Sequence, residues 1–482
     1  MHKSAGKSQW IGLILIAVLV ALANLNFVFE NAVYTVYLFV LLALLVLGVL
    51  LLNYRVPLLY FLVFTVPLSV SYPVGESILN GPSELICAFL GLYMLMRYVA
   101  GYRFTAGLIR HPLSIILLLD LLWLLFTTAT SQMPEVSFKR VIVRFVYLAV
   151  YYFMFAELFA SANKSTGKLF IYYCLGLVLP ILYYLVQHWQ IGFAIQGSTH
   201  FSQPFYNDHT VYGAALVYFL PFLFFYTFTY IKAPLYRGFY LALIVLFLVA
   251  IFFSYSRAAW LSLFCALLVY LVFRWKISTR FILVTSFLSL VVLAFLSGSL
   301  IESFSRNRGQ SHGKDVEQHF KSVTNISTDA SNVERINRWK CAWRMFLDKP
   351  LTGFGPGTYQ FFYGGFQVHS DVNDNSTYAG DKGHAHSEYL NALSETGLPG
   401  LILFVLGILF SSYTSVSILR RSDNKEDRGL AMVLFMGLIT FYIHSFFNGF
   451  IESDKMAMPV FASMAALSVL SLKLKNQPGP SI

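Results

Sequence analysis

The chain has 482 residues, of which 57% are hydrophobic, 17% aromatic and only 12% charged, and its formal net charge is +11. About a quarter of the residues of a soluble domain are charged, so this composition excludes a soluble protein and indicates an integral membrane protein. The positive charge does not indicate nucleic-acid binding, because the basic residues fall in every second loop between apolar segments, as membrane topology requires.

Apolar segments long enough to cross the hydrocarbon core as helices recur along nearly the whole chain, and we count about 14 of them. They begin near Trp10, Val33, Val56, Ser83, Leu113, Val141, Leu169, Val211, Phe239, Ala258, Phe281, Leu398, Leu430 and Met456. The third is interrupted by Pro57 and Pro67, and the tenth follows the ninth almost without a loop. The sequence therefore predicts an all-α polytopic membrane protein of about 12 to 14 transmembrane helices with one large, partly helical external loop.

Three regions follow from this pattern. Residues 1–297 form an N-terminal helix bundle, residues 298–398 form the external loop, and residues 399–482 form the C-terminal helices. The alternation of basic loops places both termini in the cytoplasm, with the large loop outside.

The informative cations are those at outer helix ends, where the topology rule does not place them. Arg140 and Arg144 are four residues apart and share a helix face, and Arg257 lies between two apolar spans. A guanidinium near lipid is costly unless an anion meets it, and phosphate suits it through paired hydrogen bonds. Arg140 and Arg144 could instead extend along the interface to lipid headgroups.

Within the external loop, the capping box Ser331–Glu334 predicts the start of an amphipathic helix of roughly four turns. Its apolar stripe of Ile336, Trp339, Trp343 and Phe346 is expected to pack on the bundle. Arg335 and Arg338 share a neighbouring face and would lie at the membrane surface, where lipid phosphates are found. The glycines at 353, 355 and 357 then predict a tight turn.

A histidine pair precedes a short predicted helix. Ser387 is a good N-cap residue, and Gly397 ends the helix before the next span. His386 therefore lies at a helix N-terminus, whose dipole helps to keep the imidazole neutral, as a general base requires. His384 or Glu388 could hold its tautomer; alternatively, these three residues could bind a divalent metal, or the histidines could be purely structural.

One set of residues resembles the hallmark region of the O-antigen ligase and polymerase superfamily. The set consists of Arg335, Trp339, Pro350, Gly353, Gly355, His386, Glu395 and Gly397. The segment Ser254–Trp260 is more loosely similar to the family's serine-arginine segment.

The resemblance implies a GT-C-like glycosyltransferase of the bacterial inner membrane, with its active site in a periplasmic loop. Its donor would be a glycan on undecaprenyl pyrophosphate and its acceptor a hydroxyl of lipid A-core, with membrane lipid around it and no nucleic acid, metal or cofactor. The implied catalytic residues are His386 as base and Arg335 and Arg257 on the pyrophosphate. Substrate binding is assigned to His384, Arg338, Arg140, Arg144 and Glu388.

Other functions differ from the ligase chiefly in the acceptor. A polymerase of O-antigen repeats and a protein O-oligosaccharyltransferase belong to the same superfamily. A lipid or glycan transporter would need paired halves and ionisable residues at mid-membrane, whereas here the polar residues collect at one outer face.

Overall fold

The computed structural model describes residues 55–74, 77–102, 104–161, 165–193, 201–276, 330–369 and 383–476. Within these ranges, nine helices are long and apolar enough to span a membrane. They are Pro112–Ala129 (α4), Pro134–Ser161 (α5, η2 and α6), Ser165–Gln190 (α7), His209–Tyr230 (α8), Pro234–Phe253 (α9), Arg257–Arg274 (α10), Glu388–Arg421 (α15), Lys425–His444 (α16) and Asp454–Lys475 (α17). The prediction of an all-α polytopic membrane protein is confirmed.

These nine helices correspond to nine of the predicted spans. The spans expected from Trp10, Val33 and Phe281 lie outside the described residues. The span expected from Ser83 is α3, Ser83–Val99, which has 17 residues. The ninth and tenth spans are joined by only three residues, Ser254 to Ser256.

The third predicted span is wrong in its second half. An apolar helix, Arg55–Leu68, ends in the 3₁₀ turn η1, Val66–Leu68, and the chain then forms an antiparallel hairpin of β1, Val70–Val74, and β2, Ser77–Gly81. Pro67 lies in that last turn, where its missing N–H cannot continue the helical ladder. The hairpin register pairs Val70 with Gly81.

Local signals in the sequence explain where the spans begin. The Asp208 carboxylate accepts the backbone N–H of Thr210 at the start of α8, and the Asn424 side chain accepts two N–H groups at the start of α16. Proline occupies the first turn of α4, α5 and α9, where its missing N–H costs no hydrogen bond. One seven-residue stretch, η2 (Leu148–Met154), is π-helical and fully buried inside the span that begins at Pro134.

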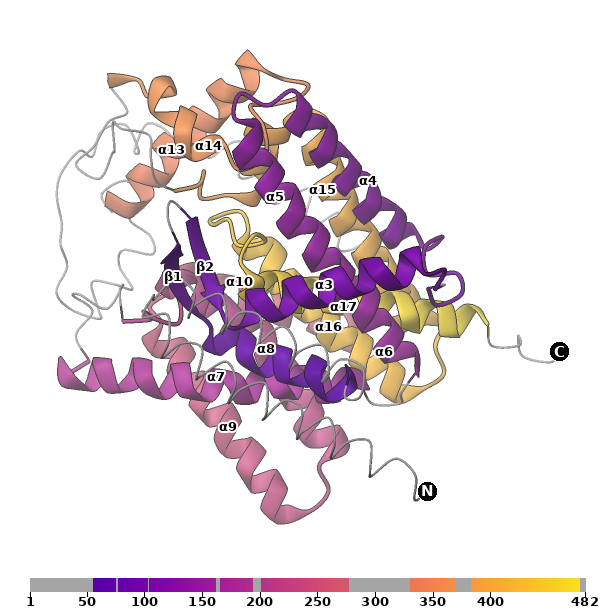
Figure 1. The fold of residues 1–482 in the computed structure, drawn as a ribbon. Helices are drawn as coiled ribbons and strands as arrows, with labels where there is room; N and C mark the ends of the chain where they lie inside the picture. The colour runs from indigo at the N-terminus through magenta and orange to yellow at the C-terminus, as the bar shows by residue number, and fades with distance from the viewer. Residues whose placement is uncertain are drawn as a thin grey trace, which may run out of the picture.

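The remaining helices form a cap at one end of the bundle (Figure 1). The cap comprises α13, Ala330–Asp348; α14, Tyr359–Phe362; η4, Tyr363–Phe366; and the first turns of α15. Both α13 and α14 pack against α15, which links the cap to the membrane-spanning helices. A small core of its own, including Cys341, Met345, Phe354, Tyr359 and Tyr363, holds the cap together.

The buried face of α13 differs from the predicted one. Glu334, Asn337, Arg338, Cys341, Ala342 and Met345 are buried. Trp343, which was expected to pack on the bundle, is 50% exposed. The partners of the polar face come from distant parts of the chain, so hydrophobic spacing alone points to the wrong side of the helix.

Candidate functional site

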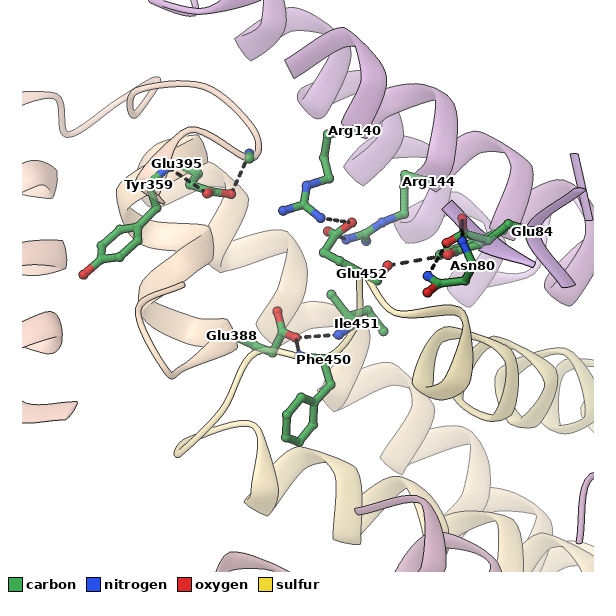
Figure 2. A network of polar contacts seen from close by, with 12 residues as sticks. Asn80, Glu84, Arg140, Arg144, Tyr359, Glu388, Glu395, Phe450, Ile451 and Glu452 are labelled. Atoms are coloured by element: carbon green, nitrogen blue, oxygen red, sulfur yellow. Dashed lines mark hydrogen bonds and ion pairs between the residues drawn. The ribbon is translucent and has the colours of Figure 1, made fainter. Parts of the chain in front are cut away.

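The glycine turn and the segment Glu395–Gly397 form one unit. The backbone N–H of Phe354 donates to the Ser394 carbonyl at 3.1 Å, and that of Gly355 donates to the Glu395 carbonyl at 2.8 Å. The Glu395 carboxylate accepts the N–H groups of Gly357 at 2.9 Å and Tyr359 at 3.0 Å (Figure 2). These hydrogen bonds between the glycine turn and the segment Glu395–Gly397 therefore attach the cap to the first turns of α15.

The histidine segment lies directly before α15, as predicted. Ser387 is the N-cap, its side chain accepting the N–H of Leu390. His386 has a φ of +49°, in the left-handed region, and its backbone N–H donates to Nδ1 of His384 at 2.9 Å. Because Nδ1 of His384 accepts a hydrogen bond, the neutral ring carries its proton on Nε2. The two imidazole centroids are 4.5 Å apart.

Two side chains of helix α13 form hydrogen bonds with the backbone of this segment. Arg338 forms a 2.7 Å ion pair with Glu334, and its guanidinium donates to the His384 carbonyl at 3.3 Å. The indole N–H of Trp339 donates to the His386 carbonyl, also at 3.3 Å. Arg338 and the motif residue Trp339 thus support the backbone of both histidines.

The surroundings keep both imidazoles neutral. Burial, followed by the charge of Arg338, lowers the pKa of His384 to about 4. Burial, followed by the effects of His384, Arg335 and Arg338, lowers the pKa of His386 to about 2. Asp208, which precedes α8, opposes both shifts. Arg335 and Arg338 therefore belong to the electrostatic environment of the imidazoles that the sequence singled out.

Arg140 and Arg144 are not at a helix end. Helix α5 begins at Pro134, so both lie within it, and both pair with Glu452, at 2.9 and 2.8 Å (Figure 2). Arg144 also contacts Asp120 at 3.0 Å. Burial raises the pKa of Glu452, but the two arginines together outweigh burial and hold the pKa below its ordinary value. The two arginines are thus paired within the protein, and their contact with a phosphate or lipid headgroup stays a prediction.

Glu388 also has a different contact from the one expected. Its carboxylate accepts the backbone N–H groups of Phe450 and Ile451, from the loop between α16 and α17 (Figure 2). Oε1 of this carboxylate therefore holds the loop in place, and a role of Glu388 in fixing the tautomer of His386 stays a prediction. Among the residues that the structure describes, no group of three His, Cys, Asp or Glu side chains is placed to hold a metal ion.

Arg257 is the first residue of α10, directly after the N-cap Ser256. This junction packs closely on α8, because a Cβ added at Gly213 would lie 3.0 Å from Cβ of Ser256. Gly213 is near the N-terminus of α8, which Asp208 caps. Arg257 therefore lies at the end of the bundle where α8 begins.

Several polar groups of the site were missed from the sequence. Asp208 contacts His209 at 2.8 Å, and Asp120 and Glu452 neutralise the arginines of α5. An acidic residue directly before an apolar span, as at Asp208, is an N-cap signal that could have been read. The pairing of Glu452 with α5 could not, because 308 residues separate it from Arg144.

Together, a bundle of membrane-spanning helices and a cap that carries half-buried imidazoles and arginines define a polytopic membrane protein with a polar site at an end of the bundle. A family model described as O-antigen ligase matches residues 242–405, a range that includes Arg257, Arg335, the glycine turn, both histidines and Glu395. Residues 242–405 are therefore similar to the O-antigen ligase family, in agreement with the resemblance of the motif region to the O-antigen ligase and polymerase superfamily. No curated protein matches the chain.

Proposed function

We propose that the protein is an O-antigen ligase, which transfers a glycan from undecaprenyl pyrophosphate to a hydroxyl of lipid A-core at the periplasmic face of the inner membrane. The observation that supports this most strongly is the neutral, half-buried His386 at the N-terminus of α15, with Arg335 and Arg338 in its electrostatic environment. A glycosyl transfer from a pyrophosphate needs a base for the hydroxyl and cations for the leaving group, and this end of the bundle has both.

In the proposed reaction, the acceptor oxygen attacks the anomeric carbon with inversion while the bond from that carbon to the phosphate oxygen breaks. His386 takes the proton of the attacking hydroxyl. Arg335 and Arg257 hold the departing pyrophosphate, whose charge increases as the bond breaks. Every proton and electron pair in this step has a named destination, so no metal or cofactor is needed.

The low pKa of His386 suggests that binding of the donor also changes how readily this imidazole accepts a proton. An imidazole with a pKa of about 2 is neutral but accepts a proton poorly. Arg335 and Arg338 contribute to that low pKa, so an anionic pyrophosphate bound beside them would raise it toward neutrality. A bound donor would therefore make His386 a better proton acceptor than it is in the free protein.

The other residues assigned from the sequence support the site in this proposal. Arg338 and His384 position the segment that carries His386, through the 3.3 Å bond to the His384 carbonyl and the 2.9 Å bond to its Nδ1. Glu388 positions the loop after α16. Arg140 and Arg144 link α5 to that loop through Glu452.

The test is complementation of a host that lacks its own ligase but makes the donor glycan. We expect the parent protein to restore the long-chain lipopolysaccharide ladder on a gel. His386→Ala, Arg335→Ala and Arg257→Ala should each reduce it by at least about a hundredfold, the usual cost of removing a general base or a charge-stabilising group. Lys340→Ala, an exposed cation of α13, is the matched control and should retain the ladder.

The acceptor is decided by where the glycan accumulates. If the parent protein leaves lipid A-core bare and lengthens the glycan on its lipid carrier, the ligase proposal is wrong and a polymerase is indicated. If the glycan appears on protein, an oligosaccharyltransferase is indicated. Immunoblots of membranes from the parent strain and from every variant strain show whether each protein is present at an equal level. A variant that is present at the parent level but lacks the ladder has lost chemistry and not protein.

A further inference from the structure

The turn between α16 and α17 contains three buried polar side chains that the proposed reaction does not use. His444, Ser445 and Asn448 are at most 1% exposed. Within the described part of the chain, both ring nitrogens of His444, the Ser445 hydroxyl and the Asn448 amide nitrogen have no hydrogen-bond partner. Buried polar groups are nearly always paired, and each unpaired one costs free energy, so a group of three requires an explanation.

This turn lies against the histidine segment. The Ser445 carbonyl accepts the N–H of Glu388 at 2.9 Å, next to the N-cap of α15. A Cβ added at Gly449 would lie 3.4 Å from the ring of His384. The Phe447 ring is 6.5 Å from that of Trp339, whose indole supports His386. The turn therefore lies beside the His384 imidazole and beside the indole that supports the backbone of His386.

The same charges act on this turn and on the histidine segment. Arg335 and Asp208 act electrostatically on His444, as they do on His384 and His386. His444 is thus in the same region as the proposed base, although it is the last residue of α16 and His386 precedes α15. Its ring lies 5.1 Å from that of Phe450, whose backbone N–H is held by Glu388.

The chemistry of the three side chains fits a neutral, hydroxyl-rich ligand. An amide, a hydroxyl and a neutral imidazole supply both donors and acceptors and no fixed charge. A phosphate would be met by guanidinium groups, which this end of the bundle supplies separately. Saccharide hydroxyls need paired donors and acceptors of this kind, and such groups confer specificity because a ligand that lacks the hydroxyl leaves them unpaired.

We propose that His444, Ser445 and Asn448 form a hydroxyl-recognition subsite that binds the sugar next to the reacting bond. This inference rests on the proposed glycan transfer and adds the residues that select the saccharide. The sugar comes either from the donor glycan or from the acceptor, and the two sources are separated by varying each substrate in turn.

The experiment uses the full-length protein, purified in detergent, with donor and acceptor lipids extracted from host cells in which its gene is deleted. Asn448→Leu and Ser445→Ala should each lower kcat/KM by about five- to tenfold, the effect of one lost hydrogen bond. The KM that rises identifies the source of the sugar. Ser453→Ala is the matched control, since Ser453 is in the same loop and its side chain makes no capping hydrogen bond.

Stability separates recognition from a structural role. Because these polar groups have no partner, their removal should leave the thermal midpoint unchanged or raise it while activity falls. A lower midpoint together with a uniform loss for both substrates would mean that the turn is structural, and kcat/KM values within twofold of the parent would also overturn the subsite. If the parent transfers no glycan, the proposed function fails and the inference fails with it; if the parent is active and the variants match it, only the inference fails.

Discussion

The half-buried imidazoles of His384 and His386 are expected to make the protein sensitive to acid. In the unfolded chain a histidine has a pKa near its ordinary value of about 6.5. In the native state, burial and neighbouring cations lower these pKa values to about 4 and about 2. Between pH 6.5 and 4 the unfolded state therefore binds protons that the native state does not bind, so stability falls as pH falls.

We predict a lower thermal midpoint at pH 5.0 than at pH 7.5, with a smaller loss in His384→Asn. Each histidine changes the free energy of unfolding by at most about 1.4 kcal/mol per pH unit in this window. The actual change is smaller because both rings are partly exposed to solvent. Asparagine keeps an acceptor for the His386 N–H but does not titrate. Differential scanning fluorimetry in detergent measures both proteins, and equal losses would show that His384 does not cause the acid sensitivity.

A second prediction concerns the carboxylate that joins Arg140 and Arg144. Glu452→Gln leaves the two guanidinium groups with too little negative charge, and Arg144 is only 12% exposed. Breaking such a pair costs up to several kcal/mol when fully buried, so we expect about 1 to 3 kcal/mol for this partly exposed site. The control is Glu135→Gln, because Glu135 is an exposed residue of α5, the helix that carries both arginines. If the thermal midpoint of Glu452→Gln equals that of the control, the ion pairs of Glu452 do not stabilise the protein.

Among the elements, α13 shows what hydrophobic spacing can and cannot predict. It begins at Ala330, close to the predicted N-cap Ser331 but with Ser331 already inside the helix. Its buried face is different, because Arg338 is fixed by the carbonyl of His384, 46 residues away. Half-exposed Trp343 is consistent with a membrane interface, where tryptophan is favoured, so apolar character alone does not determine burial in this cap.

The glycines at the base of the cap provide the third prediction. Gly397 has a φ of +70°, and an added Cβ would lie 2.2 Å from the Leu351 carbonyl oxygen. Gly397→Ala should therefore push the glycine turn away from α15 and lower the stability by more than about 1 kcal/mol, the usual cost of an alanine at positive φ with a clash.

A matched control lies on the same helix. An added Cβ at Gly407 has nothing within 4 Å, and alanine is a better helix former than glycine by about 1 kcal/mol, so Gly407→Ala should be neutral or stabilising. Thermal midpoints and the lipopolysaccharide ladder of both variants measure the difference. Equal behaviour of the two variants would mean that contact between the glycine turn and α15 is not needed.

For the whole molecule, the sequence predicts the positions of most of the membrane-spanning helices. Long apolar runs, N-cap residues and prolines at helix starts are local signals, so nine described spans agree with prediction. The β1–β2 hairpin was not predicted, because the apolar stretch that contains it resembles a span. The contacts of the site, such as the clamp of Glu388 on Phe450 and Ile451, depend on tertiary packing and leave no local pattern.

Charge distribution gives the last prediction, which concerns orientation. One end of the bundle carries the C-termini of α10, α15 and α17 with Arg274, Arg420, Arg421 and Lys473. Lys473 pairs with Asp427 at 2.9 Å, which places the start of α16 at this end too. From the positive-inside rule we predict that this end faces the cytoplasm and that the cap faces the opposite side of the membrane, which the proposed function takes to be the periplasm.

Cysteine labelling in intact cells tests this orientation. Gly365 in the cap and Asp423 between α15 and α16 are both exposed, and a side chain at Gly365 meets open space. A membrane-impermeant maleimide should modify Gly365→Cys in intact cells and Asp423→Cys only after the membrane is permeabilised. The four native cysteines are free and three of them are buried, so their background should be low. The reverse pattern would place the imidazoles of the cap in the cytoplasm, where a periplasmic lipid A-core acceptor could not reach them, and would refute the ligase proposal on topology alone.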